Sequence, residues 1–312
     1  MYVVTGGAGF IGSSLVRALL ADGKHVVVID DFSTGKRANL EGLDSARLKV
    51  VEADVLDGLE AAMSGVDDSW GAPSAIVHLA AQVSVAASLE DPLGDAQRNH
   101  CATLHVLEYA RKHAGTRVVL ASSAATYGDV DEVPVREASA RWPLSPYGIH
   151  KFSSELSLRA YAEVHGVPTA SLRFFNVYGP RQDPSSPYSG VISIFMKRGL
   201  VGEPLTIFGK GEQTRDFVFV TDVATAIRNA ASRDFRGDVF NVGTGEQTSI
   251  LALAETVARL AGQGSQVSFA PARKGEVLHS CAELSRSRAG LGYEPSVSLE
   301  HGLQQTLAWY RG

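Results

Sequence analysis

The sequence predicts a doubly wound α/β fold with a parallel sheet, followed by a smaller α/β lobe. Short apolar runs alternate with helical patterns through the first 176 of 312 residues, as expected for buried parallel strands joined by helical crossovers. Polar or glycine-rich segments follow five of these runs, so we expect them at one edge of the sheet. Beyond Phe174 the elements become shorter, and residues 179–190 are rich in Pro, Ser and Gly. A second lobe over that edge is therefore expected.

The individual elements follow from these patterns. Apolar runs bounded by turn residues predict strands of the first sheet at 2–4, 25–29, 48–51, 75–79, 117–121 and 169–174. Apolar residues at helical spacing predict helices at 10–20, 102–110 and 147–163. In the second part we expect helices at 192–200, 222–231, 250–261, 282–289 and 299–310, and strands at 205–207, 217–220 and 239–242. The first expected domain consists of residues 1–176, and residues 218–248 are expected to rejoin it. The second is a lobe made of residues 177–217 and 249–312.

The composition excludes several classes of protein. Hydrophobic residues make up 45% and charged residues 20% of the chain, which is typical of a folded protein. The net charge of −5 disfavours partners such as nucleic acid or an anionic membrane surface. Two cysteines, Cys101 and Cys281, cannot build a disulfide framework, and no spacing of His, Asp and Glu predicts a metal site. Without an apolar stretch of about 18 residues or a signal-peptide pattern, we expect a cytoplasmic protein.

A glycine loop lies between the first expected strand and the first expected helix. Gly7, Gly9 and Gly12 match G-x-G-x-x-G, and Gly6, Gly9 and Gly12 match G-x-x-G-x-x-G. Glycines allow a tight turn and a close approach of the backbone to a pyrophosphate, which the N-terminus of the helix then stabilises. The strand–turn–helix context makes this motif strong and predicts a dinucleotide-binding Rossmann fold.

An acid ends the second expected strand. Asp30 comes 18 residues after Gly12, where a carboxylate can accept both hydroxyls of an adenosine ribose and would repel a 2′-phosphate. This favours NAD over NADP. Lys36 and Arg37 follow closely and could serve a 2′-phosphate instead, although they are equally consistent with solvated loop charges.

A hydroxyl, a phenol and an ammonium group are expected to meet at the ligand edge. Ser123 follows the fifth strand, and Tyr147 and Lys151 lie four residues apart, so they share one face of the next helix. Lowering the pKa of a tyrosine from about 10 to about 7 requires ~4 kcal/mol, and one ammonium at ~4 Å supplies about that much at an effective dielectric near 20. Lys151 with a positive nicotinamide ring would thus make Tyr147 a general base.

Other chemistry is disfavoured near this edge. His78 and His150 are expected to be structural, since each is a lone histidine without metal-ligand or triad spacing. Ser123 lacks the G-x-S-x-G context of a hydrolase nucleophile.

Taken together, the motifs resemble those of the extended short-chain dehydrogenases/reductases, and specifically of the UDP-hexose 4-epimerases. The resemblance extends over essentially the whole chain. Besides the glycine loop, Ser122-Ser123 and Tyr147 to Lys151, it is carried by Asp54-Val55, His78-Leu79-Ala80-Ala81-Gln82, Asn99, Arg173-Phe174-Phe175-Asn176-Val177-Tyr178-Gly179-Pro180, Arg215-Asp216-Phe217, Asn241-Val242-Gly243 and Arg273-Lys274-Gly275-Glu276.

The resemblance implies a role for each matching residue. Catalysis would rest on Ser123, Tyr147 and Lys151. NAD would be bound by Gly6, Gly9, Phe10, Ile11, Gly12, Asp30, Asp31, Ser33, Thr34, Gly35, Asp54, Val55, Leu79, Ala80, Ala81, Gln82, Asn99, Ser122, Tyr147 and Lys151. The UDP-sugar would be bound by Ser123, Ala124, Phe175, Asn176, Val191, Leu205, Ile207, Phe208, Arg215, Arg273, Glu276 and Ser280.

The implied reaction inverts C4 of a UDP-sugar through a transient 4-keto sugar, with NAD regenerated in each cycle. At the position of Ser280 a bulky tyrosine would restrict the pocket to unmodified hexoses, so the small serine implies UDP-N-acetylglucosamine and UDP-N-acetylgalactosamine as well as UDP-glucose and UDP-galactose. Dehydration is disfavoured because Ala124 and Ala125 stand where family dehydratases carry acids.

Two alternatives remain at this point. One is a UDP-glucuronate 4-epimerase or decarboxylase of the same superfamily, which Asp183 disfavours because uronate epimerases tend to have an arginine there. The other is a non-catalytic NAD-binding protein. The resemblance also implies a homodimer, formed through the helices near 102–113 and 147–163.

Overall fold

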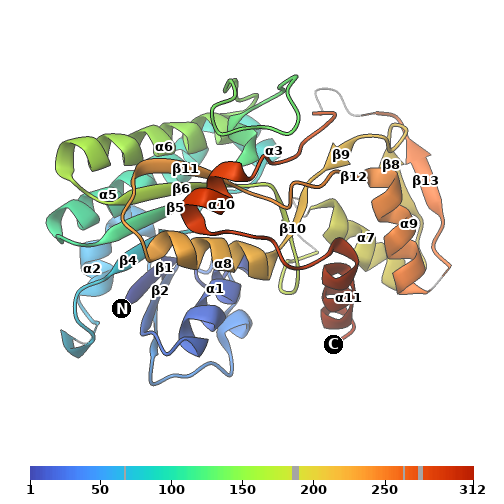
Figure 1. Ribbon diagram of the computed structural model, residues 1–312. Coiled ribbons are helices and arrows are strands. Elements are labelled where there is room, and N and C mark those ends of the chain that lie inside the picture. Colours follow the sequence, from blue (N-terminus) through green and yellow to red (C-terminus); the bar gives the residue numbers. More distant parts are fainter. Residues whose placement is uncertain (67, 185–189, 263, 273–276) are drawn as a thin grey trace.

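A seven-stranded parallel sheet forms the centre of the larger lobe in the computed structural model, which describes residues 1–66, 68–184, 190–262, 264–272 and 277–312 (Figure 1). All neighbouring strands of this sheet run parallel. Their order is β11 (Arg236–Val242), β6 (Thr169–Phe174), β5 (Arg117–Ser123), β4 (Ala75–His78), β1 (Tyr2–Thr5), β2 (Val26–Asp30) and β3 (Leu48–Glu52). The sheet confirms the predicted doubly wound fold, and the strand expected near 239–242 joins it as β11.

The strand order reverses between β1 and β4, and this point decides where a ligand can bind. β1 has β2 as its neighbour on one side and β4 on the other. The loops that follow β1 and β4 therefore run in opposite directions and leave a crevice at the carboxyl ends of these two strands. The Thr5 hydroxyl at the end of β1 and His78 Nδ1 at the end of β4 are 2.8 Å apart, which holds the two strand ends together.

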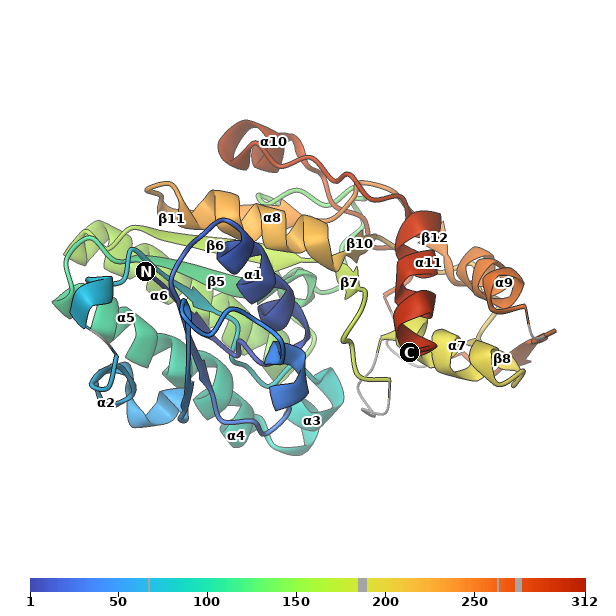
Figure 2. The same cartoon turned by 90° about the horizontal axis from the view of Figure 1, so that it is seen from below.

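Helices cover both faces of the sheet (Figure 2). One face packs against α1 (Phe10–Ala21), α8 (Val220–Ala231) and α10 (Ser285–Leu291), with Leu15, Val223 and Leu291 in its core. The other face packs against α2 (Leu59–Met63), α5 (Ala102–Lys112) and α6 (Pro146–His165), with Leu59, Val106 and Leu158 in its core. Strand residues alternate between the two cores as the pleat requires, since Val3 faces one core and Val4 the other.

Short helices line the route from β4 to α5. They are α3 (Val85–Glu90), α4 (Pro92–Ala96) and the π-helical turn η4 (Gln97–Cys101), which runs directly into α5. The 3₁₀ turns are η1 (Arg37–Leu40), η2 (Val55–Asp57), η3 (Asp68–Trp70) and η5 (Ala124–Thr126).

The smaller lobe lies beside the carboxyl edge of the sheet (Figure 2). Its helices are α7 (Val191–Leu200), α9 (Ile250–Ala261) and α11 (Leu299–Tyr310), which pack around Phe195, Leu253 and Leu303. Three two-stranded sheets complete it: β7 (Asn176–Tyr178) with β10 (Phe217–Phe219), β9 (Thr214–Arg215) with β12 (Thr248–Ser249), and β8 (Leu205–Phe208) with β13 (Val267–Ala270).

Two local expectations need correction, and four short strands were missed. The helix expected from residue 282 begins only at Ser285, because the Ala282 amide donates to the Asp216 carboxylate (3.0 Å) and the segment stays extended beside Val135. The strand expected at 217–220 ends at Phe219 because Val220 already begins α8, and it pairs with β7. The sequence analysis also missed β7, β9, β12 and β13, which are too short or too exposed for a clear period-two pattern.

Candidate active site

The glycine loop occupies the crevice between β1 and β4. Gly6 has a φ of +68°, and a Cβ there would lie 2.7 Å from the Ala80 nitrogen. A Cβ on Gly12 would lie 2.2 Å from the Gly6 oxygen, so only glycine permits this packing of the helix on the turn. By contrast, a Cβ on Gly9 would meet only the Gly6 oxygen within 4 Å, at 3.1 Å. The loop therefore leaves room at Gly9, in front of the N-terminus of α1, where a pyrophosphate fits.

Asp30 lies at the end of β2, beside this loop. Its side chain is buried, and burial raises the pKa of the carboxyl above its usual range. One oxygen accepts the Ala8 N–H at 2.8 Å and the other accepts the Phe32 N–H at 2.9 Å. Because a carboxylate offers about four acceptor positions, two remain for ribose hydroxyls.

The two cations that could favour a 2′-phosphate are engaged elsewhere. Lys36 Nζ is 2.6 Å from Asp183 on the smaller lobe, and Arg37 is paired with Glu52. The arrangement fits a dinucleotide with a free ribose, as Asp30 predicts. Farther along the expected cofactor path, Asp31 accepts from Ser33 at the surface, and the exposed Asp54 carboxylate accepts the Leu56 N–H.

The segment after β4 forms the opposite wall of the crevice. Leu79, Ala80, Ala81 and Gln82 are all half-buried there. The Asn99 amide donates to the Gln82 carbonyl at 3.0 Å, which fixes the end of this segment. Asn99 Oδ1 is buried but has no hydrogen-bond partner among the described residues. A buried acceptor without a donor is costly, so this atom also fits a site that is completed by a bound cofactor.

Ser123, Tyr147 and Lys151 come together at the carboxyl end of β5, as the sequence analysis expects. Ser145 caps α6 by accepting the Gly148 N–H at 3.2 Å, and Pro146 follows as the first helical residue, so the helix starts immediately before Tyr147. Tyr147 and Lys151 are both buried, and Lys151 Nζ lies 5.9 Å from the centre of the Tyr147 ring.

The electrostatics differ from the sequence argument in one respect. Burial raises the pKa of Tyr147 to about 12, and a hydrogen bond with the Ser123 side chain acts in the opposite direction. Burial also lowers the pKa of Lys151 to about 8, against the negative charges of Asp95 and Glu155. The sequence argument counted the nearby cations but not the desolvation, which a base at this position has to overcome. A general base at Tyr147 would therefore be favoured by the positive charges of Lys151 and of a bound oxidised nicotinamide together.

A buried ion pair that sequence reasoning missed lies directly behind these residues. Glu155 on α6 binds the guanidinium of Arg173 with two hydrogen bonds, of 2.8 and 2.6 Å, and both side chains are almost completely buried. Ser122 donates its hydroxyl to the same carboxylate at 2.5 Å. Glu155 follows Lys151 by four residues, and Arg173 interrupts an apolar strand. These two signals mark each residue as a charge that needs a partner, but they do not show that the two form a pair.

The expected UDP-sugar residues are distributed unevenly. Leu205 and Ile207 point into the core of the smaller lobe. Phe208 lies on the opposite face of β8 and is half-exposed. Phe175 is buried in the larger core. Ala124, Asn176, Val191, Arg215 and Ser280 are half-buried. Arg273 and Glu276 lie outside the described residues.

Arg215 and Ser280 lie on neighbouring segments. The Ser280 N–H donates to the Thr214 carbonyl at 3.2 Å, and the Thr214 N–H donates to the Leu278 carbonyl at 2.9 Å. Arg215 donates to the carbonyl of Thr214 at 2.8 Å. The backbone of Ser280 is thereby fixed beside the strand of Arg215, whose guanidinium suits a diphosphate.

Neither a metal site nor a membrane span is found in the part of the chain that the structure describes. No three His, Cys, Asp or Glu side chains gather there as metal ligands would. None of its helices combines the length and the apolar surface that crossing a bilayer requires.

Comparison with known proteins agrees with this geometry. The model of the NAD dependent epimerase/dehydratase family matches residues 2–243. The chain is 39% identical to the UDP-glucose 4-epimerase of Mycolicibacterium smegmatis, over 99% of its own length and 98% of that protein. Among solved structures it resembles a UDP-N-acetylglucosamine 4-epimerase from Methanobrevibacter ruminantium (TM-score 0.92, 36% identity, 99% and 97% of the two chains). It also resembles the Thermus thermophilus UDP-glucose 4-epimerase in complex with NAD (TM-score 0.88, 37% identity, 100% and 99%). The chain belongs to the NAD dependent epimerase/dehydratase family.

Proposed function

We propose that this protein is an NAD-dependent UDP-sugar 4-epimerase, an isomerase that inverts C4 of UDP-glucose or UDP-galactose and of their N-acetylated counterparts. The observation that carries the proposal is the convergence of Ser123, Tyr147 and Lys151 beside the glycine-loop crevice. The family and the UDP-sugar 4-epimerases similar to this chain support it. We assign cofactor binding to residues 1–176 with 218–248, and UDP-sugar binding to 177–217 with 249–312.

The residues of the chain divide the chemistry among themselves. NAD, when bound, supplies reversible hydride exchange at C4. Tyr147 takes the proton of the sugar 4-hydroxyl at its phenolic oxygen and returns it to the same oxygen after the sugar has rotated. Because the hydride that leaves C4 would also return to C4, no net redox change results. Ser123 holds the reacting oxygen through its hydroxyl. Lys151, charged below about pH 8, stabilises the phenolate form of Tyr147.

The choice of sugar rests on the surroundings of Ser280. A serine leaves more volume than a tyrosine would, and the backbone of Ser280 is fixed beside the strand of Arg215. This supports acceptance of a C2 acetamido group. A uronate is less suited, because Asp183 stands where an arginine would hold the sugar carboxylate and instead pairs with Lys36 at 2.6 Å.

We also propose that the protein is a homodimer through α5 and α6. The outer face of α6 exposes Ile149, Leu156 and Val164, whose exposed fractions are 47%, 53% and 74%. Apolar side chains at this spacing suit packing against the same helix of a second copy. Light scattering that gives the mass of one chain would contradict the dimer.

One experiment tests the proposed activity. The purified protein is incubated without added NAD, separately with UDP-glucose, UDP-N-acetylglucosamine and UDP-glucuronate, and the products are identified by NMR. We expect C4-inverted products from the first two nucleotide sugars. Loss of CO₂ from UDP-glucuronate would indicate a decarboxylase, and absence of all turnover in a protein that retains NAD would indicate a non-catalytic binding protein.

A further inference from the structure

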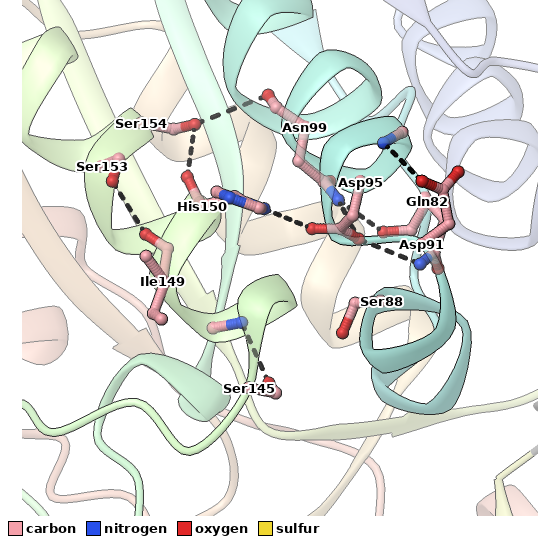
Figure 3. Close-up of polar contacts among 12 residues, drawn as sticks. Gln82, Ser88, Asp91, Asp95, Asn99, Ser145, Ile149, His150, Ser153 and Ser154 are labelled. Carbon is pink, nitrogen blue, oxygen red and sulfur yellow. Dashed lines mark hydrogen bonds and ion pairs between the residues drawn. The ribbon is translucent and has the colours of Figure 1, made fainter.

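The carboxylate of Asp95 joins three separate elements beneath the active site (Figure 3). Its side chain is completely buried. Oδ1 accepts from Gln82 Nε2 at 2.9 Å and from Asn99 Nδ2 at 3.0 Å, and Oδ2 lies 2.6 Å from His150 Nδ1. The donors come from the segment after β4, the π-helical turn η4 and the catalytic helix α6. An ionised carboxylate only accepts hydrogen bonds, so this one group can serve all three donors at once.

The π-helical turn strengthens the same connection. The Asn99 carbonyl accepts the hydroxyl of Thr103 at 2.7 Å and lies 3.5 Å from that of Ser154 on α6. Ser154 also donates to the His150 carbonyl at 2.8 Å. A π-helical turn leaves backbone groups free for such contacts and is frequent at functional sites.

The two ends of this network lie beside the reacting groups. His150 directly precedes Lys151 and follows Tyr147 by three residues. Gln82 ends the half-buried segment that forms the wall of the cofactor crevice, and its amide also donates to the Ser84 carbonyl at 2.9 Å. Asp95 therefore connects the helix of Tyr147 and Lys151 directly to this wall.

We propose that Asp95 is a positioning residue for the epimerisation, which acts through His150 on α6 and through Gln82 on the cofactor wall. This inference rests on the proposed function. It does not require Asp95 to touch substrate or cofactor. It predicts that loss of the carboxylate misaligns Tyr147 and Lys151 relative to the crevice and lowers kcat, while the UDP part of the substrate is still bound by the other lobe.

The charge of Asp95 adds a second, separable effect. It raises the pKa values of both Tyr147 and Lys151. The other charged or titratable groups beside Lys151 are Glu155 on α6 and His78 on β4, and both are retained in an Asp95 variant. His150, which contacts Asp95 at 2.6 Å, has His100 on η4 as a further titratable neighbour. Without the Asp95 charge, Tyr147 and Lys151 would both lose their protons at lower pH, so both limbs of the kcat profile would move to lower pH.

The experiment compares four variants of the full-length protein with its bound NAD. Asp95→Asn keeps the shape and removes the charge. Asp91→Asn is the matched control, because it lies four residues earlier, is exposed, and retains an oxygen to cap α4 at the Gly94 N–H. His150→Asn keeps a neutral donor near the position of Nδ1, and His150→Ala removes it. Steady-state kinetics, pH profiles and amide hydrogen exchange are measured for each.

We expect Asp95→Asn to lower kcat on the order of 10²-fold, with little change in KM, with both pH limbs shifted to lower pH, and with faster exchange at 82–84 and 147–151. His150→Ala should share the loss of kcat, and His150→Asn should restore most of it. The inference would be overturned if Asp95→Asn had the kcat, the pH profile and the amide hydrogen exchange of the wild type. It would also be overturned if the two His150 variants had equal kcat. If the wild type turned over no UDP-sugar, the proposed function would fail instead, and exchange would still decide whether Asp95 fixes these segments. Should Asp95→Asn not fold, the two His150 variants decide alone.

Discussion

Lys151 Nζ lies 5.9 Å from the centre of the Tyr147 ring, and both side chains are buried at the start of the same helix. The four-residue spacing places them on one face of α6, and the cap at Ser145 fixes where that face begins. Burial makes the ammonium easier to deprotonate and the phenol harder to deprotonate. Burial thus opposes the role of general base that we assign to Tyr147, and a positive charge bound beside it would favour that role.

Replacing Tyr147 by Phe tests the assigned base. We expect kcat to fall by about 10²–10⁴-fold because the proton acceptor is lost, with bound NAD unchanged. Tyr161→Phe is the control: it lies on the same helix outside the site and loses only a hydrogen bond to Glu108. Product formation by NMR and NAD release on denaturation provide the measurements. Near-wild-type turnover in Tyr147→Phe would refute the assignment.

Replacing Gly12 by Ala tests the cofactor crevice. The new Cβ would lie 2.2 Å from the Gly6 oxygen and 2.7 Å from the Gly7 Cα, and since both are backbone atoms the loop has to move. We expect the purified variant to carry little NAD. Gly65→Ala has nothing within 4 Å of its Cβ and should retain the wild-type content. The ratio of NAD to protein after denaturation measures both, and an equal ratio would contradict the proposed pyrophosphate position.

Replacing Ser280 by Tyr tests the choice of sugar. The larger side chain would fill the volume beside the strand of Arg215, so turnover of UDP-N-acetylglucosamine should fall while turnover of UDP-glucose is retained. Leu278→Tyr, at an exposed residue two positions away, should affect neither substrate. The measured quantity is the ratio of kcat/KM for the two sugars. An unchanged ratio would remove Ser280 from the sugar site.

The buried His78 should make stability depend on pH. Burial lowers the pKa of its imidazole to about 3, from an ordinary value of 6.5. As the pH falls below 6.5, the unfolded chain gains a proton that the folded protein does not, so stability decreases, by up to about 1.4 kcal/mol per pH unit. This loss ends near pH 3, where the folded protein is protonated too.

His78→Asn should therefore show a shallower fall in the free energy of unfolding between pH 6.5 and 4. Urea denaturation at several pH values gives the comparison. His301→Asn, the same substitution at an exposed position, should follow the wild-type curve. Parallel curves for wild type and His78→Asn would show that His78 titrates normally in the folded protein.

Much of the site was predictable because its signals are local in sequence. The glycines of the loop, Asp30 after β2 and the pair Tyr147 and Lys151 each need only a strand, a turn or one helix to be interpreted. The alternation of side chains along a strand could also have been used to divide the residues expected at the uracil. Ile207 and Phe208 are adjacent in β8, so their side chains point to opposite faces of the strand.

Contacts between distant segments could not be predicted in this way. Asp95 and His150 are 55 residues apart, and Glu155 and Arg173 are 18 apart on different elements. Each pair meets only because α4, α6 and β6 pack together. A single sequence does not show which elements pack together, and each charged residue could pair with many others.

The sequence by itself determined the fold class, the crevice at the glycine loop and the side chains to which we assign the chemistry, because strand and helix periods and turn glycines act over a few residues. Only the tertiary structure decided how strongly those side chains are desolvated, and which buried carboxylates hold them in place. Desolvation and ion pairing depend on every atom packed around a group, and most of those atoms come from elsewhere in the chain.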